Sequence, residues 1–123
     1  MADPIKLTPE ANAAYQAALT ALQSAHKRLD EITAATPVDW AAYSAGLQTC
    51  AACQASAQTA LSVYQAAILN TPDVRALIGQ LKADTQSMNQ SAAALDRTAA
   101  IFNKLASVAN TLTSTLTKIL KFI

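Results

Sequence analysis

The stretch TPVDWAAY, residues 36–43, carries several signals of a helix start. Thr36 can cap a helix, and Pro37 suits the first helical position, where its missing N–H costs no hydrogen bond. Asp39 follows Thr36 by three residues, the place of the acid in a capping box. We therefore expect a helix to begin at residue 37.

Two further Thr-Pro pairs divide the rest of the chain in the same way. Thr8-Pro9 and Thr71-Pro72 are each followed by an acid, Glu10 or Asp73, which complements the positive end of a helix dipole. Short links between long helices force neighbouring helices to run antiparallel. The predicted helices span about residues 9–35, 37–70 and 72–122.

Apolar residues recur at heptad spacing in the second and third predicted helices. In the second helix the steps alternate between three and four, at Trp40, Tyr43, Leu47, Cys50, Gln54, Ala57, Leu61, Tyr64 and Ile68. In the third, every seventh residue gives Val74, Leu81, Met88, Leu95, Phe102, Ala109, Leu116 and Ile123. This spacing is typical of helices that pack along a seam. We expect an all-α fold, an antiparallel up-down-up bundle of three long helices in a single domain, residues 1–123.

The length of the third helix raises a difficulty. Its roughly 50 residues would extend about 75 Å at 1.5 Å per residue. The second helix ends opposite a point near residue 104, so residues 105–123 either overhang the bundle or turn back as a short fourth helix. No Gly or Pro marks a break in this region. The polar residues 85–91 and the pair 103–104 are the weakest points.

The C-terminal stretch TLTSTLTKILKFI, residues 111–123, has apolar residues mostly on one side and Thr, Ser and Lys on the other. An amphipathic, weakly basic helix suits a groove on a partner protein or a membrane interface. The alternative is that it packs on its own bundle. The candidate binding residues are Phe102, Leu105, Leu112, Leu116, Lys118, Ile119, Lys121, Phe122 and Ile123.

Cys50 and Cys53 form a C-x-x-C pattern, which suggests redox or metal chemistry. With His26 and Met88 brought alongside by the antiparallel helices, they could bind Cu(I) or Zn(II). The competing interpretation is structural, because cysteine often behaves as a small buried hydrophobe. The pair also lies within a helix rather than at its N-terminus, where a low thiol pKa would be favoured.

Composition excludes several classes of function. The 123 residues include 29 alanines, and the formal net charge is +1 with no basic stripe, so no nucleic-acid binding is expected. The start has no apolar segment typical of a Sec signal peptide, and no stretch approaches 18 apolar residues. We expect a soluble chain, cytoplasmic or exported by a signal-less route. With a single His we expect no histidine pair and no conventional catalytic triad except through Cys, and the two glycines form no phosphate-binding loop.

The sequence therefore predicts a non-enzymatic protein without a cofactor or small-molecule substrate. It would bind another protein, or copies of itself, through its amphipathic C-terminal helix. One alternative is a peripheral membrane-binding effector or toxin component, and a second is a metal-binding or redox bundle that uses Cys50, Cys53 and His26. Gln54 either fixes helix register from a core position or lies at the bundle edge.

Overall fold

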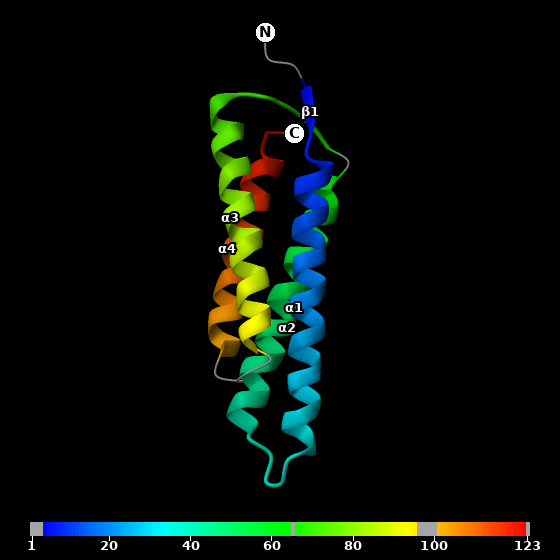
Figure 1. The fold of residues 1–123 in the computed structure, drawn as a ribbon, viewed down its shortest axis with the longest axis vertical. Coiled ribbons are helices and arrows are strands. Elements are labelled where there is room, and N and C mark those ends of the chain that lie inside the picture. Colours follow the sequence, from blue (N-terminus) through cyan, green and yellow to red (C-terminus); the bar gives the residue numbers. More distant parts are fainter. Residues whose placement is uncertain (1–3, 65, 96–100, 123) are drawn as a thin grey trace.

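The computed structural model describes residues 4–64, 66–95 and 101–122, most of which are helical. Within these residues lie four helices and one short two-stranded sheet (Figure 1). In chain order the elements are β1 (Pro4–Lys6), α1 (Thr8–Ala34), α2 (Trp40–Tyr64), β2 (Ala67–Leu69), α3 (Pro72–Leu95) and α4 (Phe102–Leu120). The all-α prediction is confirmed in its main feature, but the predicted count of three helices is wrong.

The helices form two antiparallel hairpins, α1–α2 and α3–α4, which lie against each other (Figure 1). α1 packs on α2 and α3, and α4 packs on the same two helices from the other side. Consequently α2 and α4 are neighbours that run in the same direction, as are α1 and α3 (Figure 1). The chain runs along the bundle four times in alternating directions, so the predicted up-down-up order of three helices is wrong.

Two of the three Thr-Pro pairs begin helices as predicted. Thr71 caps α3 by accepting a hydrogen bond from the Val74 N–H at 3.3 Å. α1 begins at Thr8, but the cap position is held by Leu7 and no side chain caps the helix, so the capping role predicted for Thr8 is wrong. The third pair does not start its helix. α2 begins at Trp40 because Asp39 supplies the cap, its Oδ1 accepting from the Ala42 N–H at 3.1 Å.

The second helix is shorter than predicted. It ends at Tyr64, whose carbonyl accepts a hydrogen bond from the Thr8 hydroxyl at 3.0 Å. Beyond it, β2 pairs antiparallel with β1, with Ile5 opposite Ile68. The extension of this helix to residue 70 is therefore wrong, because residues 67–69 obtain their backbone hydrogen bonds from β1 instead.

The third predicted helix is two helices. α3 continues through residues 85–91, and α4 begins at Phe102 and runs back along α3 (Figure 1). Residues 96–100, between the two helices, lie outside the described part of the chain, and neither predicted break point falls there. Turning back buries the apolar side of α4, which an overhanging helix would leave in water.

The two hairpins build their cores from different residues. The buried side of α1 is a row of small side chains, Ala11, Ala14, Ala17, Ala18, Ala21 and Ala25. α3 and α4 bury larger ones, including Val74, Leu81, Met88, Leu95, Phe102, Leu105, Leu112, Leu116 and Ile119. The residues predicted at seven-residue spacing from 74 to 116 are therefore all buried in the core.

The seam predicted for α2 is only partly in the core. Cys50 and Ala57 are buried, but Trp40, Leu47 and Leu61 are exposed. The buried side carries small side chains, at Gly46, Thr49, Cys50, Cys53, Ser56, Ala57, Ala60 and Val63. Small residues let α2 approach α1 and α4 closely, and large ones at these positions would hold the helices apart.

Hydroxyl groups join α2 to α4. The Thr49 hydroxyl donates to the Phe102 carbonyl at 2.8 Å, and the Ser56 hydroxyl to the Ala109 carbonyl at 2.7 Å. Both pairs are 53 residues apart in sequence, so the two parallel helices keep the same register over the heptad that separates the two bonds. These bonds satisfy polar groups that would otherwise be costly to bury.

Candidate functional site

Most of the apolar residues predicted to bind a partner lie inside the bundle. Five of them, all on α4, have side chains that are at most 1 % exposed: Phe102, Leu105, Leu112, Leu116 and Ile119. Lys118, Lys121 and Phe122 are exposed, and Ile123 lies outside the described residues. The structure thus divides the predicted site into a buried apolar part and an accessible part at the C-terminal end of α4.

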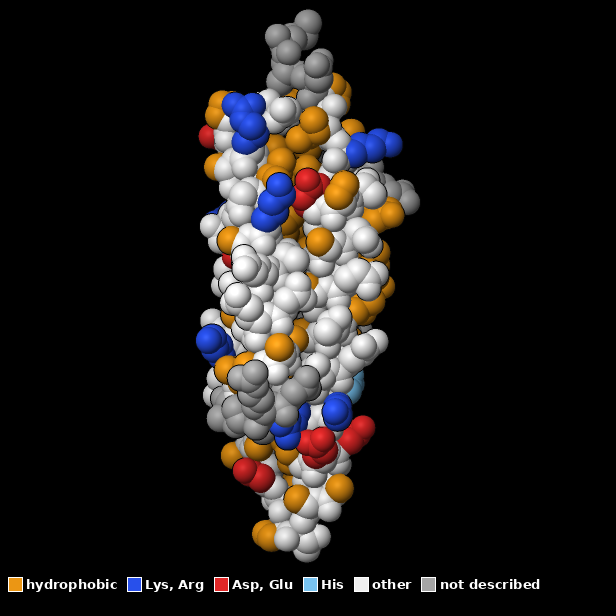
Figure 2. Space-filling model, in the orientation of Figure 1, with side chains coloured by type: hydrophobic (Ala, Val, Ile, Leu, Met, Phe, Trp, Pro, Cys, Tyr) orange, Lys and Arg blue, Asp and Glu red, His pale blue; other side chains and the backbone are white. Residues whose placement is uncertain are grey.

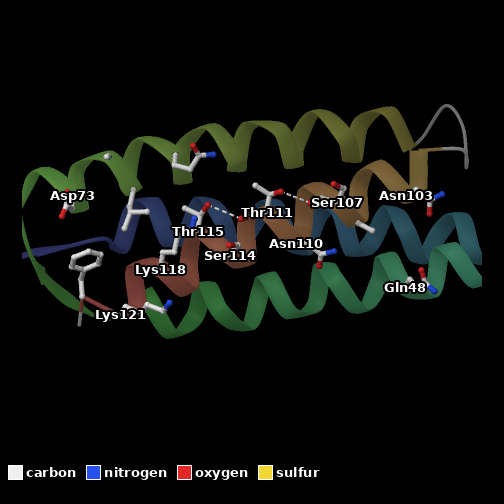
Figure 3. A pocket seen from close by; sticks show the side chains of 15 residues that line it. Gln48, Asp73, Asn103, Ser107, Asn110, Thr111, Ser114, Thr115, Lys118 and Lys121 are labelled. Carbon is white, nitrogen blue, oxygen red and sulfur yellow. Dashed lines mark hydrogen bonds between the residues drawn. The ribbon is translucent and has the colours of Figure 1, made fainter.

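The outward side of α4 forms the floor of a long groove with a volume of about 1130 Å³ (Figure 3). Figure 3 shows α3 along one side and α2 along the other. The floor consists of Asn103, Ala106, Ser107, Asn110, Thr111, Ser114, Thr115 and Lys118. The remaining lining residues are Asp73, Ala76, Leu77 and Gln80 of α3, Gln48 of α2, and Lys121 and Phe122 beyond α4. The floor side chains are mostly short, which leaves the space between the flanking helices open.

Charge in the groove is confined to one end. Lys118 and Lys121 lie there together with Asp73 at the start of α3 (Figure 3). Phe122, which is 45 % exposed, supplies an aromatic ring at the same end. Toward Asn103 the lining is uncharged. The groove therefore offers a basic and apolar end and a long floor of hydroxyl and amide groups.

A buried carboxylate lies beneath the groove wall. Asp84 of α3 is 5 % exposed, and its Oδ2 accepts from the Thr115 hydroxyl at 2.6 Å. Its Oδ1 accepts from Gln80 Nε2 at 2.7 Å. Because both donors line the groove, these bonds fix the two side chains and tie α3 to α4. Buried polar groups that are satisfied in this way make the packing of the two helices specific.

The chemistry of the groove suits binding. Its lining residues include neither His nor Cys, and the only carboxylate among them is Asp73. The titratable groups of the lining are Asp73, Lys118 and Lys121, all at one end of the groove. Hydroxyl, amide and ammonium groups can instead donate to and accept from a bound segment.

The surroundings of the two cysteines are those of buried, unreactive thiols. Both are free, Cys53 is fully buried, and burial together with the neighbouring Cys50 raises the pKa of the Cys53 thiol to about 12. Burial also raises the pKa of Cys50. Thiols held in the protonated form are poor nucleophiles and poor metal ligands.

The predicted metal cluster does not assemble. Among residues 4–64, 66–95 and 101–122, no three His, Cys, Asp or Glu side chains come together as ligands, so His26 does not join Cys50 and Cys53. His26 is exposed and Met88 is buried in the core. Gln54, for which two positions were open, is exposed on α2.

Most of the groove was not predicted from the sequence. The groove floor is visible in the sequence as polar residues at steps of three and four, all short except the last: Asn103, Ser107, Asn110, Ser114 and Lys118. The walls were not predictable, because they depend on α4 turning back between α2 and α3.

Comparison with protein families, with curated proteins and with solved structures found no match to this chain. Nor does any helix in the described residues have the length and apolar character needed to cross a membrane.

Proposed function

We propose that this protein is a non-enzymatic binding protein that takes up a helical segment of a partner protein in the groove along α4. The observation that carries the proposal is the groove itself, which follows the helix from Asn103 to Phe122. A 19-residue helix such as α4 is about 28 Å long, so a partner helix of about five turns would match it. Helix-in-groove binding is a common mode of protein recognition.

The residues of the groove set the chemistry of the partner. Lys118 and Lys121 favour an acidic residue at one end of the bound segment, and the exposed ring of Phe122 favours an apolar residue beside it. The short floor residues allow the partner backbone to come close, and their hydroxyl and amide groups can bond to polar side chains. A segment of mixed polarity with one acidic, apolar end fits this description best.

Photo-crosslinking in the cells that make the protein tests the proposal. A photoreactive phenylalanine analogue replaces Asn110 on the groove floor, and the control carries it at Gln86, an exposed α3 residue outside the groove. We expect Asn110 to capture a discrete partner protein that Gln86 does not capture. Replacing Ser107 and Ser114 by Trp should abolish that crosslink by filling the groove, while circular dichroism shows the helices intact.

Two results would count against the proposal. Equal crosslinks from Asn110 and Gln86 would mean that the groove has no specific occupant. Flotation of the full chain with vesicles containing phosphatidylglycerol, lost in Lys118→Glu with Lys121→Glu, would instead favour the membrane-binding alternative, since those two lysines lie at the basic end of the groove.

A further inference from the structure

α2 has an unusual surface for an exposed helix. No Asp, Glu, Lys, Arg or His occurs between Asp39 and Asp73, so the whole of α2 is free of charged side chains. A helix that packs on a core with one side normally carries charged residues on the other. The face shown in Figure 2, by contrast, has basic side chains toward both ends and a cluster of acidic ones toward its lower end. The outward side of α2 therefore lacks the usual features of a solvated surface.

The outward residues of α2 follow a heptad spacing. We call the following set the α2 stripe, and all of its members are exposed: Trp40, Ser44, Leu47, Ala51, Gln54, Gln58 and Leu61. Steps of four and three keep such residues in one line along a helix, which is the arrangement that packs against another helix. The stripe is separate from the groove, since none of its members lines that space.

Large apolar side chains lie at intervals along the stripe. Trp40 is 67 % exposed, Leu47 47 % and Leu61 51 %, so the stripe carries three of the five large hydrophobic side chains found exposed in the described residues. The Trp40 ring meets Tyr43 edge-on, with ring centroids 5.6 Å apart. A tryptophan held by a neighbouring ring loses little further freedom on binding, which makes it an effective anchor.

Charges at the two ends of the stripe indicate what covers it. Asp39 stands beside Trp40 at one end. Lys6, exposed and paired with Ala67 across the small sheet, stands just beyond the other end. A second copy laid antiparallel brings the acid of each chain toward the lysine of the other, whereas a parallel copy would place like charges together. Antiparallel helix dipoles also attract each other.

We propose that a second copy of this chain packs antiparallel on the α2 stripe, related to the first by a two-fold axis near Ala51. In that pairing the numbers of facing residues sum to about 101, so Trp40 faces Leu61 of the second copy and Leu47 faces Gln54. The small side chain of Ala51 at the centre lets the two backbones approach. An interface that rests mainly on one helix falls below about 1,200 Å² of buried surface, the lower limit for stable complexes, so the dimer depends on concentration.

The first test is the mass of the full chain by sedimentation equilibrium over a range of concentrations. We expect the mass to rise from 12.9 kDa toward twice that value. Leu47→Glu and Leu61→Glu should each weaken association about tenfold or more, because they place a charge in the interface. Leu69→Glu changes an equally exposed leucine outside the stripe and should leave association unchanged. A wild-type chain that remains monomeric, or a Leu69→Glu chain as impaired as Leu47→Glu, overturns the proposal.

The second test concerns direction and uses Cys50→Ala, Cys53→Ala as background. Added to it, Ala51→Cys should form an intermolecular disulfide across the axis. Leu47→Cys should not, because the two copies of residue 47 lie about 10 Å apart along the helices, beyond the roughly 7 Å limit between the α-carbons of a disulfide. If Leu47→Cys crosslinks as readily as Ala51→Cys, the helices are parallel and the proposal is wrong.

Discussion

The two hairpins of this bundle achieve burial in different ways. In α1–α2 the core is built mainly from Ala, Gly, Ser, Thr and Cys, whereas α3 and α4 bury Phe, Leu, Ile, Val and Met. A small side chain removes little apolar area from water but lets helix backbones approach, and a large one does the reverse. The first hairpin therefore depends on close fit and hydrogen bonds, and the second on apolar area.

This comparison predicts that the largest single losses of stability come from α4. Leu112→Ala deletes a fully buried side chain and should lower the free energy of unfolding by about 2–5 kcal/mol. Leu61→Ala, at a 51 % exposed leucine on α2, should lower it by less than about 0.5 kcal/mol. Urea unfolding followed by circular dichroism at low protein concentration measures both. Similar losses at the two sites would contradict the comparison.

Close packing around α2 predicts that substitution by Ala has opposite effects on stability at Gly46 of α2 and at Gly79 of α3. A Cβ added at Gly46 would lie 2.5 Å from Leu29 Cδ2 and 3.0 Å from Phe102 Cζ, whereas nothing lies within 4 Å of one at Gly79. Gly46→Ala should therefore cost about 1–3 kcal/mol by overpacking, despite the better helix propensity of Ala. Gly79→Ala should stabilise the protein by about 0.5–1 kcal/mol. A stabilised Gly46→Ala chain would show that α2 and α4 are not closely packed there.

The hydrogen bonds between α2 and α4 predict a smaller effect. Ser56→Ala removes the donor to the Ala109 carbonyl and leaves that buried oxygen without this bond, at a cost of about 1 kcal/mol. Ser62→Ala is the control, because its exposed hydroxyl bonds only within its own helix, to the Gln58 carbonyl. Thermal unfolding of the two variants should separate them by several degrees. Equal midpoints would mean that the Ser56 bond contributes nothing.

The last effect concerns the Cys53 thiol. It is absent at neutral pH and appears only in alkali. The folded pKa, about 12, lies above the ordinary value of 9.0, because burial opposes the thiolate. The stability that comes from keeping this thiol neutral is present in full below about pH 9 and is lost as the pH rises toward 12. Cys53→Ala should consequently lose less stability than the wild type over that range. Identical pH profiles would show that the thiol is not held neutral by the fold.

The helix boundaries show which features can be predicted from neighbouring residues alone. At Thr71 the helix begins as predicted, because a side-chain cap acts on the backbone within one turn and needs no distant partner. α1 also begins close to its predicted start, but without a side-chain cap. The second start was three residues late, since Asp39 provided a better cap than Thr36. The end of α2 at Tyr64 could not be predicted locally, because it depends on β1 at the other end of the first hairpin.

The heptad pattern predicted for residues 74–116 lies in the core, but the seam predicted on α2 faces the core only in part. Trp40, Leu47 and Leu61 were predicted to lie in the core, but they are exposed. Gly46, Thr49 and Ser56 are buried instead. Spacing alone cannot decide which of two stripes faces inward when the neighbouring helix is alanine-rich. The groove was missed for a related reason, since its floor was visible in the sequence but its walls belong to α2 and α3.

The sequence by itself determined that the chain is mainly helical, where two of the four described helices begin, and that residues 74–116 carry a continuous apolar repeat. These properties follow from propensities, caps and periodicity, which act over a few residues. Only the tertiary structure decided that α4 turns back and which side of α2 is buried. Both outcomes depend on how closely helices far apart in sequence can pack, which is a property of pairs of surfaces and not of any single helix.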